Sequence, residues 1–384
     1  MSHLLNFVNT VDALNPFTPH GERNMTRFLD MFADTGTAIL GYDHSLCSNG
    51  EALNDLEETL AHLPLHVPHV IPYKLREKAS TLLCEQNGYD KIFWSCSGEQ
   101  AVEAMLKFAR KATGRTVWAV PDTGQFHGRT YGAMSVSVQQ ENHISGHQPL
   151  VPGVMRFTDP FVIDENVACV ILTPGLLNKV YEPYQKDWVQ KICSRAKEVG
   201  ALVCFDETQT HLRLGRDWGY ELYDIDKPDM ICTAKGIAGG IPCGVTFLND
   251  SIADKLARGG HFNTFGASPR ACAGAIYVAE HKEELINDAV VIGEIIFSRF
   301  REAELHEKIS IGAWHSDGAM HHIELPGIDP VRLVENCAYE GVLVQMPKEP
   351  VLKLTPPLMY SIGKIEKACD IIINQIPKSM KEEK

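Results

Sequence analysis

The chain has 384 residues, which is too long for one ordinary hydrophobic core and predicts two domains, or one large and one small unit. Its 44% apolar and 22% charged residues are typical of a globular protein and argue against intrinsic disorder. Acidic residues outnumber basic ones by 49 to 36, which gives a formal charge of −13. Because phosphate contacts need a basic face, nucleic-acid binding is a poor interpretation.

The cysteines and the first residues indicate the compartment. Eleven cysteines are scattered along the chain without a Cys-x-x-Cys pair, and several lie in apolar runs, as small buried side chains in a reducing compartment do. The segment from Met1 to Leu5 has no early Lys or Arg, and the chain has no run of 18 apolar residues, so we expect neither a signal peptide nor a membrane span. We therefore expect a cytoplasmic protein that binds no membrane.

Short apolar strands alternate with amphipathic helices from about residue 75 to residue 280. Apolar stripes predict one helix from 101 to about 112 and another from 188 to about 200. This alternation predicts an α/β fold whose mostly parallel sheet is covered by helices on both faces, with ligands bound beyond the carboxyl ends of the strands. The strands are expected at 91–96, 116–120, 167–172, 201–205, 230–233 and 244–248.

The two ends of the chain differ from this middle part. Helical patterns over 270–305 and Pro-containing, strand-like segments over 310–360 predict a smaller α+β domain. The first forty residues carry Pro16 and Pro19 with weak patterning, and we expect them to pack onto it. The chain is accordingly divided into a large domain at 45–280 and a small domain made of 1–44 and 281–384.

Two polar segments near the first predicted helix are candidates for ligand binding. Ser97, Gly98 and Glu99 lie between a strand and a helix, where free N–H groups can bind a phosphate, although Ser97 alone would serve equally as an ordinary N-cap. Phe126 precedes His127 and a glycine, so its ring is available to stack on a flat ligand. On its own, this aromatic residue is better explained by core packing than by a ligand.

Two further segments carry groups that can do chemistry. Asp206 and Glu207 directly follow a buried strand. Burying an acid there costs free energy unless it pairs with a cationic heterocycle or caps the N-terminus of a helix. Lys235 closes the next strand and precedes the Gly239–Gly240 turn. Most lysines are simply solvated, but a lysine in a dry site at a strand end can have a lowered pKa and form a Schiff base.

Taken together, these segments resemble the class III aminotransferases, which have the type I fold of pyridoxal-phosphate enzymes. The resemblance extends over nearly the whole chain, from the turn at Leu40 to the Pro-Pro-Leu segment that ends at Leu358. It implies a pyridoxal 5′-phosphate cofactor that is held as a Schiff base by Lys235, which then moves protons. It also implies that Asp206 pairs with the pyridine nitrogen and so keeps the ring an electron sink.

Other roles follow from the same resemblance. Phe126 matches the aromatic residue that stacks on the cofactor ring, and Gly98 and Glu99 match the phosphate-binding turn. Gln209 matches a glutamine near the phenolic oxygen of the cofactor. Thr264 matches a threonine that reaches the phosphate of the other subunit, which implies a homodimer with shared active sites. No metal site is expected.

The chain departs from the family where substrates bind. Thr173 stands where the family usually has a glutamate, and Lys353 stands where it has an arginine that binds a carboxylate. A lysine attracts a carboxylate only as a point charge, without the planar two-point contact. Thr173, Lys353 and Arg213, which could replace the arginine, are the substrate-binding candidates. Glu99 replaces a small residue, and we expect its side chain to point away from a phosphate or to meet a cation.

Three functions remain open. The leading one is a transaminase that moves an amino group from an amine or amino-acid donor to a keto-acid or aldehyde acceptor. The altered carboxylate-binding pair keeps a pyridoxal-phosphate racemase, epimerase or aminomutase as an alternative, and a cofactor-binding homologue without turnover is the third. The subfamily also stays open: the segment at 126–130 is similar to the acetylornithine branch, and the length of the one at 210–215 to the glutamate-semialdehyde aminomutase branch.

Overall fold

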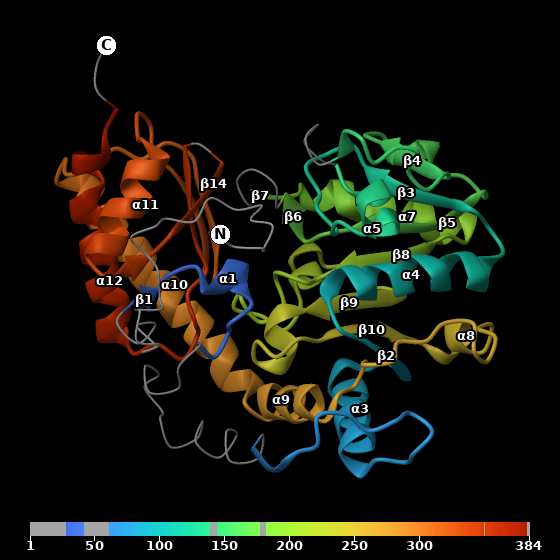
Figure 1. The fold of residues 1–384 in the computed structure, drawn as a ribbon. Coiled ribbons are helices and arrows are strands. Elements are labelled where there is room, and N and C mark those ends of the chain that lie inside the picture. Colours follow the sequence, from blue (N-terminus) through green and yellow to red (C-terminus); the bar gives the residue numbers. More distant parts are fainter. Residues whose placement is uncertain (1–27, 42–60, 139–143, 177–181, 349, 382–384) are drawn as a thin grey trace.

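A seven-stranded sheet forms the centre of the larger body of the molecule (Figure 1). The computed structural model describes residues 28–41, 61–138, 144–176, 182–348 and 350–381. The strand order is β2-β10-β9-β8-β5-β3-β4, in which β10 runs antiparallel to both neighbours and the other pairings are parallel. The strands are β2 (Lys91–Ser95), β3 (Val117–Pro121), β4 (Val154–Phe157), β5 (Val167–Leu172), β8 (Leu202–Asp206), β9 (Met230–Ala234) and β10 (Gly244–Leu248).

Helices cover both faces of this sheet. Alternate residues of β5 belong to different apolar clusters: Ile171 packs with α4 (Gly98–Thr113), and Val170 packs with the opposite layer. The opposite layer contains α3 (Lys74–Asn87), α7 (Lys186–Val199) and α9 (Pro269–Glu280). This burial on both sides explains why the strands are continuous apolar runs. Shorter helices are α5 (Tyr131–Val136) and α8 (Asp250–Ala253).

The bounds of α4 illustrate how the sequence sets the elements near the site. The hydroxyl of Ser97 accepts a hydrogen bond from the Gln100 N–H at 3.4 Å, which caps the helix at the carboxyl end of β2. Gly114 ends the helix with a φ of 70°, a left-handed conformation that suits glycine. The first turn of α4 is therefore fixed beside the strand ends.

A second, antiparallel sheet forms the smaller body, with the order β11-β12-β15-β14. Its strands are β11 (Trp314–Asp317), β12 (Met320–Glu324), β14 (Gln345–Lys348) and β15 (Val351–Leu354). The helices of this part are α10 (Lys282–Leu305), α11 (Pro330–Tyr339) and α12 (Ile362–Gln375). Two short pairs complete the strands: β1 (Leu29–Asp30) with β13 (Val342–Leu343), and β6 (Gly175–Leu176) with β7 (Glu182–Pro183).

The start of the described chain is held between the two bodies, where α1 (Ala33–Gly36) lies in Figure 1. Ala33, Asp34 and Thr35 all have positive φ angles, of 46°, 47° and 58°. The carboxylate of Asp30 fixes the entry to this turn, since its Oδ1 accepts the N–H groups of Phe32 and Ala33 at 2.9 Å each. The turn presents its backbone to the end of β9.

The predicted α/β fold class is confirmed, including the helices on both faces of the sheet. The sequence did not predict β4 or the antiparallel direction of β10. The two sheets lie on either side of the boundary predicted near residue 280, and the division into domains stays a prediction. No described helix is long and apolar enough to cross a membrane.

Candidate active site

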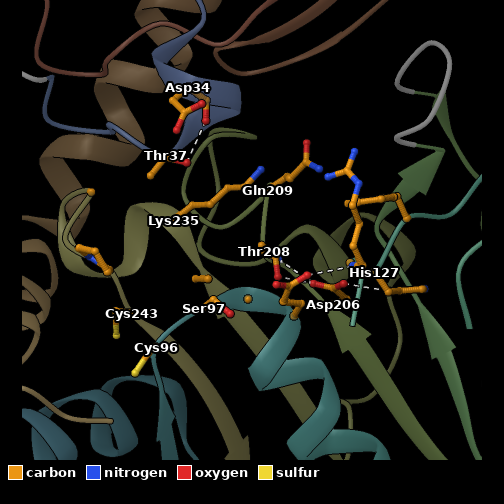
Figure 2. Close-up of a pocket in the computed structure, with 18 of the residues that line it drawn as sticks. Asp34, Thr37, Cys96, Ser97, His127, Asp206, Thr208, Gln209, Lys235 and Cys243 are labelled. Carbon is orange, nitrogen blue, oxygen red and sulfur yellow. Dashed lines mark hydrogen bonds and ion pairs between the residues drawn. The ribbon is translucent and has the colours of Figure 1, made fainter. Parts of the chain in front are cut away.

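A cavity of about 440 Å³ opens at the carboxyl ends of β8 and β9, beside the first turn of α4 (Figure 2). Its walls come from segments far apart in the sequence, between residues 34 and 243. Six of the residues predicted to bind the cofactor line it: Gly98, Glu99, Phe126, Asp206, Gln209 and Lys235.

Lys235 directly follows β9, and its side chain projects into this cavity (Figure 2). Its φ of 46° is unusual for a residue with a side chain, and its Nζ donates to the carbonyl of Thr35 at 3.0 Å. Burial, followed by the positive charge of Arg213, lowers the pKa of Lys235 to about 8. The amine is thus easier to deprotonate than an exposed lysine, which is what a nucleophilic lysine requires.

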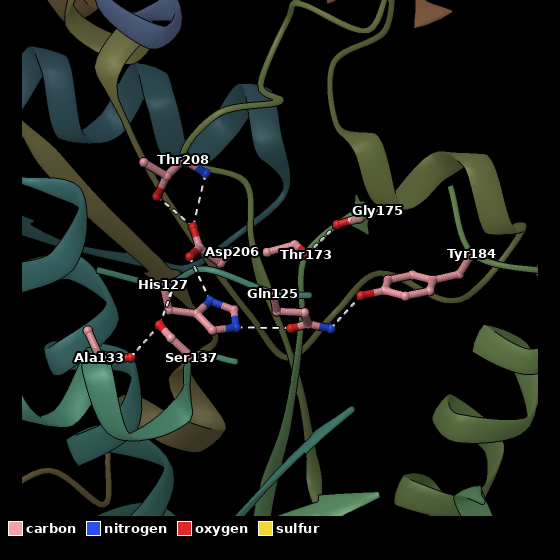
Figure 3. A network of polar contacts seen from close by, with 9 residues as sticks. All are labelled: Gln125, His127, Ala133, Ser137, Thr173, Gly175, Tyr184, Asp206 and Thr208. Atoms are coloured by element: carbon pink, nitrogen blue, oxygen red, sulfur yellow. Dashed lines mark hydrogen bonds and ion pairs between the residues drawn. The ribbon is translucent and has the colours of Figure 1, made fainter. Parts of the chain in front are cut away.

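Asp206 ends β8 and is 3% exposed, with its carboxylate held by several donors (Figure 3). Its Oδ1 accepts the Thr208 N–H at 3.0 Å and the Thr208 hydroxyl at 2.5 Å. Its Oδ2 lies 2.8 Å from Nδ1 of His127, and a carboxylate can only accept in such a contact, so the imidazole donates. These hydrogen bonds fix the orientation of the carboxylate in the cavity wall.

The network continues behind His127. The Nε2 of His127 lies 2.9 Å from Oε1 of Gln125, and Nε2 of Gln125 donates to the Tyr184 hydroxyl at 2.7 Å. Both His127 and Gln125 are buried. The orientation of Asp206 is therefore fixed by side chains that reach from the core toward the cavity.

The side-chain amide of Gln209 forms a hydrogen bond with a buried lysine of the smaller body. The Nζ of Lys353, on β15, donates to Oε1 of Gln209 at 2.9 Å. Lys353 is 3% exposed and does not line the cavity. Burial, followed by the positive charges of Lys235 and Arg213, lowers the pKa of Lys353 to about 7.

The phosphate-binding candidates lie where the helix begins. A Cβ added to Gly98 would approach the methyl group of Thr208 to 2.7 Å, so a larger residue would crowd this wall. Glu99 turns its carboxylate to the backbone, where Oε2 accepts the Arg129 N–H at 2.9 Å. The guanidinium of Arg129 lies 5.3 Å from the ring centroid of Phe126, and both residues line the cavity.

The remaining candidates lie away from the cavity. Arg213 is 1% exposed and donates to three backbone carbonyls, those of Gly36 at 3.1 Å, Thr355 at 3.2 Å and Pro356 at 2.7 Å. Thr173 is fully buried and donates to the carbonyl of Gly175 at 2.6 Å.

Thr264 is exposed and lies outside the cavity of this single chain. Sequence reasoning missed other residues that line the cavity, among them Asp34, His127, Arg129 and Thr208. His127 and Arg129 stand in the same five-residue segment as Phe126, which was the available signal. Asp34 carried no signal, because only the fold brings residue 34 to the end of β9.

The cavity fits pyridoxal phosphate. It combines a buried amine at Lys235, a buried carboxylate at Asp206, an aromatic ring at Phe126 and the first turn of a helix, whose leading N–H groups have no partner inside the helix. These are the groups that a pyridine ring carrying an aldehyde and a phosphate requires.

Comparison with known proteins agrees with this assignment. The family model for class III aminotransferases matches residues 21–376. The acetylornithine aminotransferase of Archaeoglobus fulgidus is 33% identical over 360 residues, covering 91% of each chain. A putative LysW-aminoadipate semialdehyde/glutamate semialdehyde transaminase of Pyrococcus horikoshii is 30% identical and covers 91% of this chain and 92% of its own.

Solved structures agree with respect to the fold. The ornithine aminotransferase of Toxoplasma gondii, whose structure reveals partial occupancy of PLP at its active site, superposes with a TM-score of 0.82 at 22% identity, covering 92% of this chain and 86% of its own. An S-selective transaminase from Arthrobacter gives a TM-score of 0.79 at 22% identity, covering 94% and 90%. The isomerase alternative finds no support among these relatives. The match to the family model extends from residue 21 to 376, and the matches to these curated relatives cover nine-tenths of their length. This chain therefore belongs to the class III aminotransferases and is a pyridoxal-phosphate-dependent aminotransferase.

Proposed function

We propose that Lys235 holds the cofactor and that Asp206 pairs with its ring nitrogen, in an enzyme that exchanges an amino group between an amine or amino-acid donor and a keto-acid or aldehyde acceptor. One observation carries this proposal: the amine of Lys235 and the carboxylate of Asp206 line the same cavity, from the ends of the paired strands β8 and β9. Phe126 supplies the flat apolar face against the ring.

Asp206 would act through its fixed negative charge. Bound pyridoxal phosphate supplies a ring that accepts the electron pair left when the substrate carbon loses a proton. The donors from His127 and Thr208 hold both oxygens of the Asp206 carboxylate in place, so that the carboxylate could pair with the ring nitrogen. Asp206 would in this way hold a proton at that nitrogen, which strengthens the ring as an acceptor of the electron pair.

Lys235 would act first as a nucleophile and then as a base. With a pKa of about 8, about one Nζ in ten is neutral at pH 7, against fewer than one in a thousand for an ordinary lysine. When it is not bonded to the cofactor, the Nζ of Lys235 would be free to take a proton from the substrate carbon, because it lines the same cavity. Proton transfer by a positioned base contributes roughly 10²–10⁴-fold to the rate.

The first turn of α4 is the proposed phosphate site. The N–H groups of Gly98 and Glu99 begin the helix and add its positive dipole end to the cavity wall. The Glu99 carboxylate accepts a hydrogen bond from the Arg129 backbone, which would turn it away from a bound phosphate. This orientation would reduce the repulsion between the acid and the phosphate that the sequence suggests.

Arg129 is the proposed site for a substrate carboxylate. Apart from histidine, the basic side chains that line the described cavity are those of Lys235 and Arg129. Thr173, Lys353 and Arg213 do not line it and are engaged with other protein groups. A guanidinium can bind a carboxylate through two parallel hydrogen bonds, so Arg129 replaces these three as the leading substrate residue.

A homodimer with shared sites is also proposed. Phe262 and Phe265 are 61% and 64% exposed on either side of Thr264, next to the cavity wall, since Asn263 contacts the lining residue Cys96. A second copy of the chain that covers these rings would bring Thr264 toward its neighbour's cavity.

We further propose a cytoplasmic location, because all ten cysteines in the described ranges are free thiols.

Product analysis tests the proposed reaction. Amino donors are incubated with the purified enzyme, with and without a keto acid or aldehyde, and both products are quantified by mass spectrometry. We expect one oxidised donor for each aminated acceptor, and no turnover beyond one equivalent per site when the acceptor is omitted. Sustained conversion of the donor to an isomer without an acceptor would instead establish the racemase or aminomutase reaction. A Lys235→Ala variant measures the background.

A further inference from the structure

Lys353 is a buried lysine that the proposed chemistry does not use. It lies on β15 in the smaller body, while the atom it contacts, Oε1 of Gln209, belongs to a residue that lines the cavity. The contact joins residues 144 positions apart at a distance of 2.9 Å. Lys353 therefore stands behind Gln209 as seen from the cavity.

The chemistry of the two side chains fixes the orientation of the amide. A lysine amine that contacts an amide oxygen does so as a donor, whereas the amide of glutamine has one accepting and one donating end. Contact with Lys353 therefore requires the amide oxygen of Gln209 to point toward β15. The NH₂ group of the same amide then points away from Lys353. Among the described residues, no protein acceptor takes these N–H groups, so they are available to a ligand in the cavity.

The surroundings of Lys353 make this contact its main polar interaction. In the sheet it stands opposite His322 on β12 and Gln345 on β14. The charged groups that act on it are Lys235 and Arg213, both positive, and no described acid forms an ion pair with it. A polar group buried in this way is stabilised by the hydrogen bond that it keeps, and losing that bond is costly.

We propose that Lys353 is a positioning residue: by binding the oxygen of Gln209, it turns the NH₂ group of Gln209 into the cavity as a donor to the ring oxygen of bound pyridoxal phosphate. The inference rests on the proposed cofactor site. Lys353 touches neither cofactor nor substrate and acts only through Gln209. It differs from a carboxylate-binding role, for which the amine of Lys353 would have to reach the cavity.

A double-mutant cycle tests the inference without substrate. The variants are Lys353→Met, Gln209→Ala and both together, and the measured quantity is the pH midpoint of the absorbance change of bound pyridoxal phosphate. A donor to the ring oxygen stabilises its deprotonated form, so each single variant is expected to raise the midpoint by about one pH unit. The double variant should shift it no further than Gln209→Ala alone, because Lys353 has then lost the residue through which it acts.

Two further variants keep the test decisive if Lys353→Met disturbs the small sheet. Lys353→Arg retains donors toward the amide oxygen and should restore most of the wild-type midpoint. Gln209→Glu leaves Lys353 with an acceptor but removes the donor from the cavity, so it should raise the midpoint by about one pH unit or more. An unchanged midpoint in Gln209→Glu, or additive shifts in the cycle, would overturn the positioning role.

The same measurements separate this inference from the proposed site. If the wild-type protein takes up no pyridoxal phosphate with a visible absorbance band, the assignment of the cavity as the cofactor site fails. If the band is present and titrates, but the shifts of the two single variants add, only the role of Lys353 fails.

Discussion

Nδ1 of His127 donates to Oδ2 of Asp206 at 2.8 Å, and both side chains are buried at the base of the cavity. The two residues lie 79 positions apart and come from a loop after β3 and from the end of β8. The contact leaves the carboxylate little freedom to rotate, since Thr208 holds its other oxygen. Both oxygens are thus fixed before any ligand binds.

Replacing Asp206 with alanine should leave cofactor binding largely intact and slow proton removal strongly. The ring nitrogen would lose its counter-charge, at a cost of about 3–5 kcal/mol, as for a broken buried ion pair. Single-turnover kinetics would measure the loss. Glu207→Gln is the matched control, because the Glu207 carboxyl points to the Tyr220 N–H and away from the cavity, so its turnover should stay near that of the wild type. Near-normal turnover in Asp206→Ala refutes the assigned role.

Replacing His127 with leucine should lower kcat by roughly 10- to 150-fold, the range that corresponds to a hydrogen bond to a charged group of about 1.5–3 kcal/mol. The reason is that Asp206 keeps Thr208 but loses the donor on its second oxygen. The affinity for pyridoxal phosphate, measured by equilibrium dialysis of the apoenzyme, should fall less than kcat. A His127→Leu enzyme with unchanged kcat would show that Thr208 alone is sufficient.

Lys235 should carry the cofactor and should react at a lower pH than an ordinary lysine. Borohydride treatment is expected to fix the mass of the cofactor on the peptide that contains Lys235, and label on another lysine would contradict the assignment. Because burial lowers the pKa of Lys235 to about 8, the reactive neutral amine appears as the pH rises through about 8. Stopped-flow absorbance of cofactor capture by the apoenzyme should therefore show a half-maximal rate near this pH.

Glutamate and 2-oxoglutarate should be poor substrates. The motivation is the joint replacement of the family's glutamate and arginine by Thr173 and Lys353, both of which are engaged with protein groups. Losing the two-point contact to a second carboxylate should cost about 1.5–3 kcal/mol, or roughly 10- to 150-fold in affinity. Specificity constants for glutamate, alanine and simple ω-amines measure this. Glutamate as the best donor would mean that Arg129 or another group replaces the lost arginine fully.

The enzyme should be active only as a dimer. Thr264 and its exposed aromatic neighbours Phe262 and Phe265 are expected to lie in the interface. Sedimentation at assay concentration should give twice the mass of the chain, and Phe265→Asp should shift the equilibrium toward a monomer that binds pyridoxal phosphate weakly. An active monomer would exclude shared sites. The control is Phe161→Asp, which changes an exposed aromatic residue in the short 3-10 helix Pro160–Val162 after β4 and should leave the protein dimeric.

The sheet could be predicted from the sequence more fully than the site. The strands β5 and β10 begin and end at the predicted residues, because continuous apolar runs bounded by polar residues are strong local signals. The four-residue strand β4 was missed, since it carries the exposed residue Arg156 and has no long apolar run. The antiparallel direction of β10 is a property of the whole sheet and leaves no local pattern.

Most contacts within the site could not be predicted from the sequence, for the same reason. Lys235 and Asp206 stood out because polar residues at the ends of apolar strands are rare and costly. The hydrogen bonds from His127 to Asp206 and from Lys353 to Gln209 join residues 79 and 144 positions apart. Arg213 was a substrate-binding candidate in the sequence, but its guanidinium donates to the carbonyls of Gly36, Thr355 and Pro356. Only the tertiary packing of the chain decides such pairings.

The parallel pairing of β1 with β13 has a consequence for how the protein is made. Leu29 pairs with Val342, so the first described strand leaves the ribosome more than 300 residues before its partner. The seven-stranded sheet is complete once Leu248 has been synthesised, whereas the turn at 33–36 waits for Thr355 and Pro356 to reach Arg213. The carbonyl of Thr35 that contacts Lys235 belongs to this turn, so a nascent chain acquires its complete amine pocket only after Pro356 has been synthesised.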